Sequence, residues 1–210
     1  NRQPRRALIS LLSAAALAPL CGVGLEPNAL FSDGAVLQQD AVLPIWGRAA
    51  PGTEVTVRLA GRTASAETGE DGTWRVRLDP VSTPGPHTLV MSGGGQTVAA
   101  EDVLVGEVWL ASGQSNMAWP LAQSSGAEAA KARARYPRLR FFKVNIRRGV
   151  RPKDRVVGQW VEISPENVRH YSAVAFYFAE SLLSSLDRPI GIILSAVGGS
   201  PAETWTPYDT

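Results

Sequence analysis

The sequence Val103–Met117, VLVGEVWLASGQSNM, joins an apolar run to a short polar segment and decides the fold of the second half of the chain. Such an apolar run is typical of a buried strand in a parallel sheet. Gly113 allows the backbone to turn sharply where the run ends. Ser115 would then lie at the carboxyl edge of the sheet, where open α/β sheets bind their ligands. The pattern makes Ser115 a candidate nucleophile for a reaction that develops an oxyanion.

A second interpretation of the same segment involves no chemistry. Turns between strands and helices are commonly rich in Gly, Ser and Asn. Ser115 would then cap a short helix and Asn116 would be a turn residue. The spacing of these residues alone leaves both interpretations open.

After this stretch, segments with helical spacing alternate with short apolar runs, which predicts an α/β fold with a parallel sheet. The expected elements are a helix over Ala127–Arg135, a strand over Leu139–Val144, a helix over Val168–Leu186 started by Ser164-Pro165-Glu166, and a strand over Pro189–Leu194. Right-handed crossovers would bring successive strand ends to one edge of the sheet. The turn at Gly198-Gly199 is therefore expected beside Ser115.

Before this stretch, residues 25–102 show short runs of alternating polarity with Gly and Pro between them. Strands are expected over Val42–Gly47, Glu54–Leu59, Thr73–Leu78, His87–Met91 and Gln96–Ala100, with a hairpin at Ser92–Gly95. Short strands at close spacing predict a small all-β sandwich domain over 25–102, followed by the α/β domain over 103–210. Such a sandwich either binds carbohydrate or simply packs against its neighbour.

Residues 1–24 have the pattern of a secretory signal peptide. Arg5 and Arg6 precede an apolar segment, Ala7–Leu20, that is short for a membrane span. This pattern predicts a bacterial protein that is secreted or periplasmic; a buried N-terminal helix is the alternative, and Cys21 is a candidate lipidation site. The chain starts with Asn, so we expect its beginning to be incomplete. A single cysteine excludes an internal disulfide.

Charge and composition give no reason to expect nucleic acid as a partner. The formal net charge is +2, and it becomes −1 without Arg2, Arg5 and Arg6 of the expected signal. The segment Lys131–Arg155 carries eleven Lys or Arg and one Asp, which would attract an acidic sugar or form a solvated basic face. Two isolated histidines and one cysteine do not form a metal-ligand cluster, and no cofactor is expected. The sequence carries no signal for an oligomeric state.

Four blocks of the sequence, in order, resemble the sialate O-acetylesterase family, which belongs to the SGNH (GDSL-like) hydrolases. They are LFSDGAVLQQ at Leu30–Gln39, the stretch around Ser115, YSAVAFYFA at Tyr171–Ala179, and GGSPAETW at Gly198–Trp205. The resemblance implies an SGNH-type sheet, here its N-terminal part, and a carbohydrate O-acetylesterase activity on a substrate such as acetylated sialic acid or xylan. It implies that Ser115 is the nucleophile.

The resemblance also implies the other members of the site. Gly198 and Gly199 would supply oxyanion donors, with Asn116 and Gln114 as further oxyanion or substrate-binding residues. Trp119 and Trp205 would line a sugar pocket or belong to the core.

The general base is where this sequence departs from the family. Family members carry an Asp followed three residues later by a catalytic His, and no such pair occurs in this chain. His170 does not match that histidine and is expected to be a cap or surface residue. Either the chain is part of a longer enzyme, or the activity has been lost. We expect little esterase activity from this chain alone, and the alternative function is a non-catalytic carbohydrate-binding protein with a degenerate hydrolase sheet.

Overall fold

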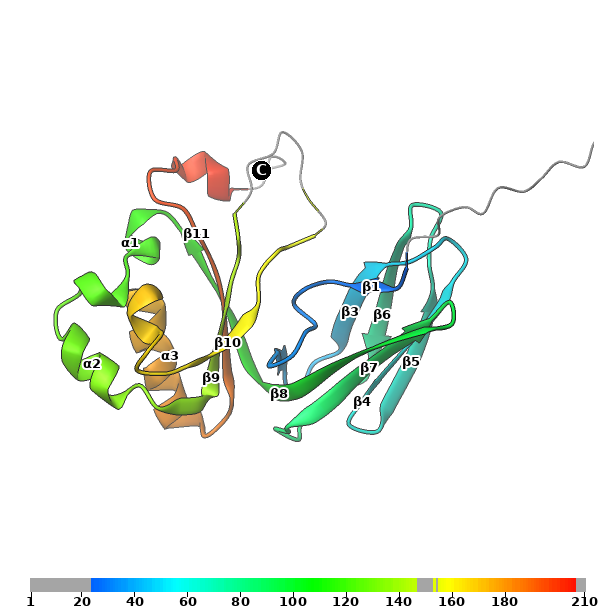
Figure 1. Cartoon of the computed structure of the whole chain (residues 1–210), viewed down its shortest axis with the longest axis horizontal. Helices are drawn as coiled ribbons and strands as arrows, with labels where there is room; N and C mark the ends of the chain where they lie inside the picture. Colours follow the sequence, from blue (N-terminus) through cyan, green and yellow to red (C-terminus); the bar gives the residue numbers. More distant parts are fainter. Residues whose placement is uncertain (1–23, 147–152, 154, 207–210) are drawn as a thin grey trace, which may run out of the picture.

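A computed structural model describes residues 24–146, 153 and 155–206. The chain forms a β-sandwich and an α/β half that lie side by side (Figure 1). One strand, β8 (Gln96–Gly113), runs from the first part into the second. The expected signal segment lies outside the described residues. No helix of the described part is both long and apolar enough to cross a membrane.

The sandwich consists of two packed sheets. One has the strand order β1-β3-β6, formed by β1 (Glu26–Pro27), β3 (Leu43–Arg48) and β6 (Thr73–Leu78). The other contains β4 (Glu54–Leu59), β5 (Arg62–Glu67), β7 (His87–Gly93) and the first half of β8. β3, β4 and β6 alternate buried and more exposed residues, so each strand contributes one side to the core between the sheets.

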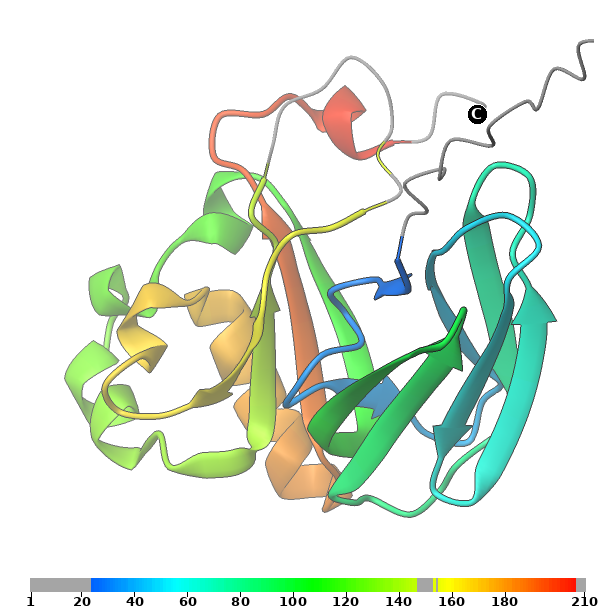
Figure 2. The ribbon, with the colours of Figure 1, turned by 45° about the vertical axis from the view of Figure 1, so that its right-hand side comes forward.

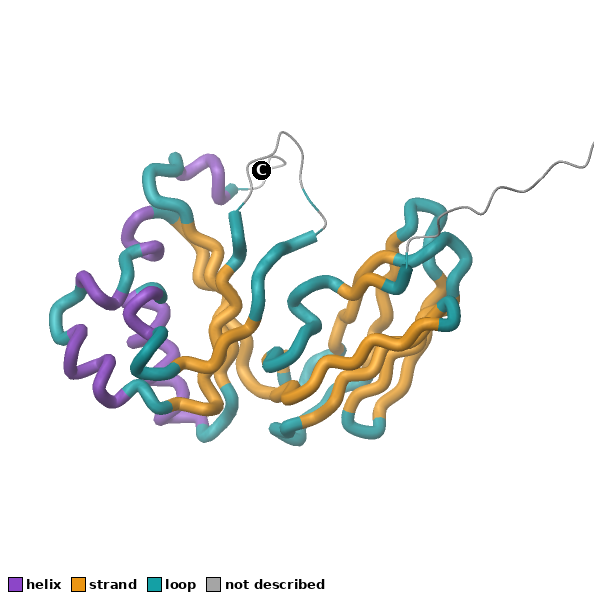
Figure 3. Tube along the Cα trace, viewed as in Figure 1, coloured by secondary structure: helices purple, strands orange, loops and turns teal. Residues whose placement is uncertain are grey.

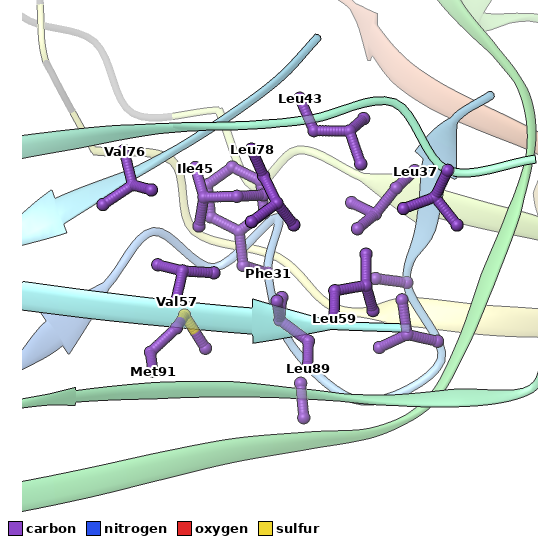
Figure 4. Packing of buried hydrophobic residues seen from close by; sticks show 14 of the residues in the cluster. Phe31, Leu37, Leu43, Ile45, Val57, Leu59, Val76, Leu78, Leu89 and Met91 are labelled. Carbon is purple, nitrogen blue, oxygen red and sulfur yellow. The ribbon is translucent and has the colours of Figure 1, made fainter. Parts of the chain in front are cut away.

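The core between the two sheets is fully apolar at its centre (Figure 4). Ile45 and Val76 of one sheet and Val57, Leu89 and Met91 of the other are all completely buried. The hairpin between β7 and β8 turns on Gly94 and Gly95, whose positive φ values of 57° and 75° suit a two-residue turn. The expected hairpin is thus confirmed, with β7 extended to Gly93.

Strand β8 corrects the prediction of two separate strands over Gln96–Ala100 and from Val103 onward. The 18 residues form a single strand that pairs with β7 in its first half and with β11 (Ile190–Ala196) in its second. Asp102, with a φ of +55°, stands where the strand passes from one partner to the next. β2 (Val36–Gln38) pairs with β8 in parallel just beyond this point. The division at 102/103 stays a prediction, since backbone pairing continues through it.

The α/β half is built on the strand order β10-β9-β11-β8. β9 (Tyr136–Lys143) and β8 both lie parallel to β11, whereas β10 (Trp160–Ile163) is antiparallel to β9. The α/β class expected from the sequence is confirmed. The sheet is mixed and not purely parallel, because β10, which was not predicted, runs antiparallel to β9. The helices α1 (Ser115–Ala118), α2 (Ala127–Arg133) and α3 (Ala173–Leu186) lie on the face away from the sandwich (Figures 2 and 3).

Several predicted element boundaries are wrong. α2 ends at Arg133 and not at Arg135. β9 begins at Tyr136, three residues before the predicted strand, and ends at Lys143. α3 begins at Ala173, well after the predicted start signal at Ser164-Pro165-Glu166.

The late start of α3 has a local cause. The Asn167 carboxamide accepts the backbone N–H of Ser164 at 3.0 Å and donates to the Glu162 carbonyl at 2.7 Å. These bonds close a turn at Ser164, and only a short 3-10 helix, η2 (Val168–His170), follows it. The true N-cap is Ser172, whose hydroxyl accepts the N–H of Ala175 at 3.1 Å.

The apolar run that predicts β8 is buried only in part. Val103 and Val105 are completely buried, but Trp109 is 44% exposed and Leu110 is 67% exposed. In this part of β8 the only strand partner among the described residues is β11, so one edge of the strand is unpaired there. The edge of Trp109 packs against the ring of Phe178 of α3, with 5.1 Å between the centroids.

Candidate active site

The ends of β8 and β11 place two turns next to each other. Gly113, the last residue of β8, pairs with Ala196, the last residue of β11. The Val197 N–H continues this pairing by donating to the Gly113 carbonyl at 2.9 Å. The segments that follow the two strands therefore emerge at the same edge of the sheet, as the sequence predicted for Ser115 and Gly198-Gly199.

Ser115 is the first residue of α1 and its side chain is partly exposed. The N–H of Gly199 points to the Ser115 hydroxyl oxygen, with 3.4 Å between nitrogen and oxygen. A Cβ added at Gly198 would lie 3.7 Å from the same oxygen. The hydroxyl therefore faces the Gly198-Gly199 turn. The N-cap of α1 is Gln114, so the interpretation of Ser115 as a helix cap is wrong.

Gln114 makes the shortest contacts with Ser115. Its side-chain oxygen Oε1 accepts the Ser115 hydroxyl at 2.6 Å and the Ser115 backbone N–H at 2.7 Å. The Gln114 side chain thus occupies both the N–H and the O–H of Ser115. In ester hydrolysis the O–H has to donate to a general base and the N–H can bind the oxyanion. In this position Gln114 does not act as an oxyanion donor, because its side-chain oxygen and not its amide nitrogen faces Ser115.

Two glycines of the site have backbone angles that other residues rarely adopt. Gly113 has a φ of +140° at the end of β8, and Gly199 has a φ of +75° in the second turn. These values lie in the region where a Cβ is strongly disfavoured. The positions of Ser115 and of the Gly199 N–H therefore both depend on glycine.

The other predicted site residues lie farther from the Ser115 hydroxyl. Asn116 is exposed and lines a hollow with Trp119 and Val174; the structure gives it no hydrogen bond to Ser115. Trp119 is 48% exposed and donates its indole N–H to the Gln123 carbonyl at 3.1 Å. Asn116 as an oxyanion donor stays a prediction, and neither Trp119 nor the partly exposed Trp205 belongs to the core.

Trp205 is fixed to the glycine turn by a short chain of hydrogen bonds. Its indole N–H donates to the Ser200 hydroxyl at 2.8 Å, and Ser200 donates to the Val197 carbonyl at 2.8 Å. Trp205 belongs to the 3-10 helix η3 (Ala202–Trp205). Ser200 was not among the predicted site residues, although its place directly after the two glycines was a signal for a turn-stabilising hydroxyl.

Within residues 24–206, apart from the segment not described, no imidazole or carboxylate makes a hydrogen bond with Ser115. His87 contacts the Thr83 carbonyl at 2.8 Å in the sandwich, and His170 is an exposed residue of η2. The same residues contain no group of three or more His, Cys, Asp or Glu side chains that could hold a metal ion.

Among the described residues of the basic segment Lys131–Arg155, five cations are paired with carboxylates. These pairs are Lys131 with Glu128, Arg133 with Glu180, Arg138 with Asp187, Arg140 with Asp102, and Arg155 with Glu26. The Arg133 hydrogen bonds lower the pKa of Glu180, so that carboxylate stays ionised at neutral pH. Attraction of an acidic sugar by this segment as a whole stays a prediction.

Comparison with known proteins gives a consistent result. No family model matches the chain. The sialate O-acetylesterases of Pongo abelii and Homo sapiens are similar to it, with 33% and 32% identity in alignments 205 positions long that cover 88% of this chain. The protein of the same name from Rattus norvegicus is 31% identical in an alignment 219 positions long that covers 95% of this chain.

A solved structure shows the same similarity in three dimensions. The crystal structure of a carbohydrate acetylesterase from Xanthomonas citri is 42% identical to this chain, with a TM-score of 0.81 over 86% of the chain. Over most of its length the chain is similar to sialate O-acetylesterases. This sialate O-acetylesterase-like chain spans about two fifths of the length of the relatives it matches, with 39–40% of the curated proteins and 42% of the solved chain covered.

Proposed function

We propose that this sialate O-acetylesterase-like chain carries the nucleophile and part of the oxyanion site of a carbohydrate O-acetylesterase. The observation that carries the proposal is the position of the Ser115 hydroxyl, which is partly exposed and faces the N–H of Gly199 at 3.4 Å. An ester-hydrolysing site needs a nucleophilic oxygen and backbone donors at this kind of distance from each other. The names of the relatives support the class of substrate.

In the proposed reaction, the Ser115 oxygen attacks the carbonyl carbon of an acetyl ester on a sugar. The hydroxyl proton passes to a general base, and the negative charge that develops on the carbonyl oxygen is held by N–H donors. The tetrahedral intermediate collapses when the sugar oxygen leaves and takes the proton, which gives an acetyl group on Ser115. Water, deprotonated by the same base, then releases acetate and restores the hydroxyl.

The N–H groups of Ser115 and of the Gly198-Gly199 turn are the proposed oxyanion donors. In the structure the Ser115 N–H is occupied by Gln114 Oε1 at 2.7 Å. The Gln114 side chain must therefore rotate away before the Ser115 N–H can bind an oxyanion. We infer that Gln114 orients the hydroxyl in the resting enzyme and exchanges places with the substrate carbonyl.

The general base is proposed to come from residues outside the described part of the chain. None of the described residues places an imidazole or carboxylate in hydrogen-bond contact with Ser115. Acetylated sialic acid and acetylated xylan are the proposed substrates, with Trp119 and Trp205 as candidate sugar contacts. We also propose that residues 1–24 act as an export signal. The division into two domains at 102/103 is proposed as well.

The test is acetate release from an aryl acetate, from O-acetylated sialic acid and from acetylated xylan. It is measured for the 210-residue chain and for the same chain together with any native sequence that flanks it. We expect little turnover from the chain alone and turnover abolished by Ser115→Ala in any active form. Turnover that survives Ser115→Ala would contradict the proposal. Carbohydrate binding without acetate release in every form would favour the non-catalytic alternative.

A further inference from the structure

The Gly199 N–H belongs to a four-residue turn, Val197–Ser200, that directly follows β11. Gly198 and Gly199 are its two central residues, and the φ of +75° at Gly199 is the value expected at the third residue of a type II turn. A rotation of the central peptide by about half a turn converts a type II turn into a type I turn. After such a rotation the Gly199 N–H would point away from Ser115.

The two central glycines make this rotation easy. Glycine adopts positive and negative φ values about equally readily. Both glycines are exposed, and a Cβ added at Gly199 would meet no atom within 4 Å. The surroundings of Gly199 therefore leave room for the rotation, and the contacts at the two ends of the turn become important for the direction of its N–H.

Ser200 joins the two ends of the turn. Its hydroxyl donates to the carbonyl of Val197 at 2.8 Å, which links the last residue of the turn to the first. Val197 is itself held, because its N–H donates to the carbonyl of Gly113 at 2.9 Å. The Ser200 hydroxyl therefore ties the turn to the end of β8.

Trp205 fixes the direction of the Ser200 hydroxyl. Its indole N–H donates to the Ser200 oxygen at 2.8 Å. Because the oxygen accepts this bond, its own hydrogen is directed at the Val197 carbonyl, and the two consecutive bonds strengthen each other. Trp205 is half-buried, whereas the other three residues of η3 are exposed (red, beyond the end of β11 in Figure 1). The indole is therefore the group that anchors η3 to the turn.

We propose that Trp205 is a positioning residue for the esterase reaction. Acting through Ser200, its indole N–H holds the turn in the form that directs the Gly199 N–H at the Ser115 oxygen. This inference rests on the proposed function, and it assigns to oxyanion binding a residue that does not contact the Ser115 hydroxyl. The role belongs to the indole N–H and not to the ring, so it is separate from a contact between the ring and a sugar.

The first test is the kinetics of acetate release by an active form of the protein. Trp205→Phe keeps an aromatic ring and removes the N–H. We expect kcat to fall about tenfold with KM unchanged, because an oxyanion donor acts mainly in the transition state. Ser200→Ala should lower kcat by at least the same factor, and Ser200→Thr, which keeps the hydroxyl, should restore most of it.

A double variant shows whether the indole acts through the hydroxyl. Trp205→Phe combined with Ser200→Ala should be no slower than Ser200→Ala alone, since the indole then has no hydroxyl to direct. Two matched controls remove the same kinds of bond elsewhere. Trp160→Phe removes an indole bond of 2.9 Å to a backbone carbonyl, and Ser184→Ala removes a hydroxyl bond of 2.8 Å to one. Both controls should keep the original kcat.

The 210-residue chain itself gives a second readout, which needs no activity. In ¹H–¹⁵N spectra the Gly199 amide signal should shift in Trp205→Phe, and its hydrogen should exchange faster with solvent, because the contact with Ser115 is made for less of the time. The signals of the sandwich should stay where they are, which shows that the variant is folded.

Three outcomes would overturn the positioning role. An unchanged kcat in Trp205→Phe shows that the N–H does not matter, and a raised KM with unchanged kcat shows a sugar contact instead. A double variant slower than Ser200→Ala by the full factor of Trp205→Phe shows that the indole does not act through the hydroxyl. Turnover that survives Ser115→Ala contradicts the proposed function and this inference with it. Turnover lost in Ser115→Ala and normal in Trp205→Phe contradicts only the positioning role.

Discussion

The hydroxyl oxygen of Ser115 lies 3.4 Å from the backbone nitrogen of Gly199, although 84 residues separate the two in the sequence. Their proximity follows from the parallel pairing of β8 with β11, which ends at Gly113 and Ala196. Each strand is followed by a turn that depends on a glycine with positive φ. The relationship between Ser115 and Gly199 is therefore fixed by the sheet and not by a flexible loop alone.

The two glycines of the second turn should respond differently to alanine. Gly199 has a φ of +75°, so Gly199→Ala strains the turn by about 1–3 kcal/mol and moves its N–H away from Ser115. We expect turnover to fall about 10²-fold or more, as for loss of one oxyanion donor. Gly198→Ala introduces no positive-φ strain, so its added Cβ, 3.7 Å from the Ser115 oxygen, should reduce turnover less. Gly95→Ala is the matched control, because Gly95 has the same φ of +75° and open space for a Cβ but lies in the β7–β8 hairpin of the sandwich. Acetate release by any active form of the protein measures the effect of each variant. Unchanged turnover in Gly199→Ala would contradict the role of the Gly199 N–H as an oxyanion donor.

Gln114 should affect the orientation of the Ser115 hydroxyl. Gln114→Ala removes the oxygen that accepts both hydrogens of Ser115, so the hydroxyl is free to rotate. We expect the rate of Ser115 modification by an aryl fluorophosphonate to change severalfold. Gln114→Glu keeps an acceptor oxygen at the same position and should hold the hydroxyl in place. If Gln114→Ala reacts at the original rate, the hydrogen bonds seen in the structure do not matter for reactivity.

Arg140 joins the α/β half to the bend of β8 and should be important for stability. Its side chain is 7% exposed, pairs with Asp102 at 2.8 Å and donates to the Pro137 carbonyl at 3.1 Å. We expect Arg140→Met to lower the free energy of unfolding by about 1.5–3 kcal/mol, because the charge-assisted hydrogen bonds of the buried guanidinium are lost. Asp102 is 54% exposed, so Asp102→Asn should cost less, at about 1 kcal/mol.

Urea unfolding of the whole chain measures both changes. Arg138→Met is the control, since the exposed Arg138–Asp187 pair is expected to contribute only about 0.5 kcal/mol. Equal stability of Arg140→Met and Arg138→Met would show that the buried arginine does not hold the two halves together.

The Glu180 carboxylate should make stability depend on pH in the acid range. Arg133 donates two hydrogen bonds of 2.8 Å to it, Tyr136 donates one of 2.6 Å, and the Arg133 bonds lower its pKa below the ordinary value of 4.5. A carboxyl with a lowered folded pKa contributes stability above its unfolded pKa. That stability is lost as the pH falls through the folded pKa.

Glu180→Gln is therefore expected to lower the Tm at about pH 7, and the difference from the original chain should shrink at about pH 3. Thermal melts followed by circular dichroism measure this. Glu128→Gln provides the control, because Glu128 is 90% exposed and lies 3.9 Å from Lys131. A Tm difference for Glu180→Gln that grows as the pH falls would contradict the assignment.

The sequence predicts the strands whose side chains alternate between core and solvent. Glu54–Leu59 and Thr73–Leu78 form β4 and β6 with the predicted bounds, because burial on one side enforces the pattern. β5 was not predicted, since its residues Arg62–Glu67 are mostly polar and exposed and the strand forms through backbone pairing with β4. The break expected between two strands is a bend within β8 at Asp102, which local composition does not distinguish from a turn.

The candidate site could be predicted in its topology but not in its side-chain detail. Strand order alone brings Ser115 and Gly199 to one edge of the sheet. The direction of the Gln114 side chain depends on rotamers that the sequence does not determine.

Covalent labelling of the protein decides whether Ser115 is the nucleophile. The chain, alone and with any native flanking sequence, is treated with an aryl fluorophosphonate, and the modified residue is found by mass spectrometry of its peptides. We expect the form that hydrolyses acetyl esters to be labelled on Ser115, and Ser115→Ala to be neither labelled nor active. Label on another residue of an active form, or hydrolysis that continues in Ser115→Ala, would contradict it.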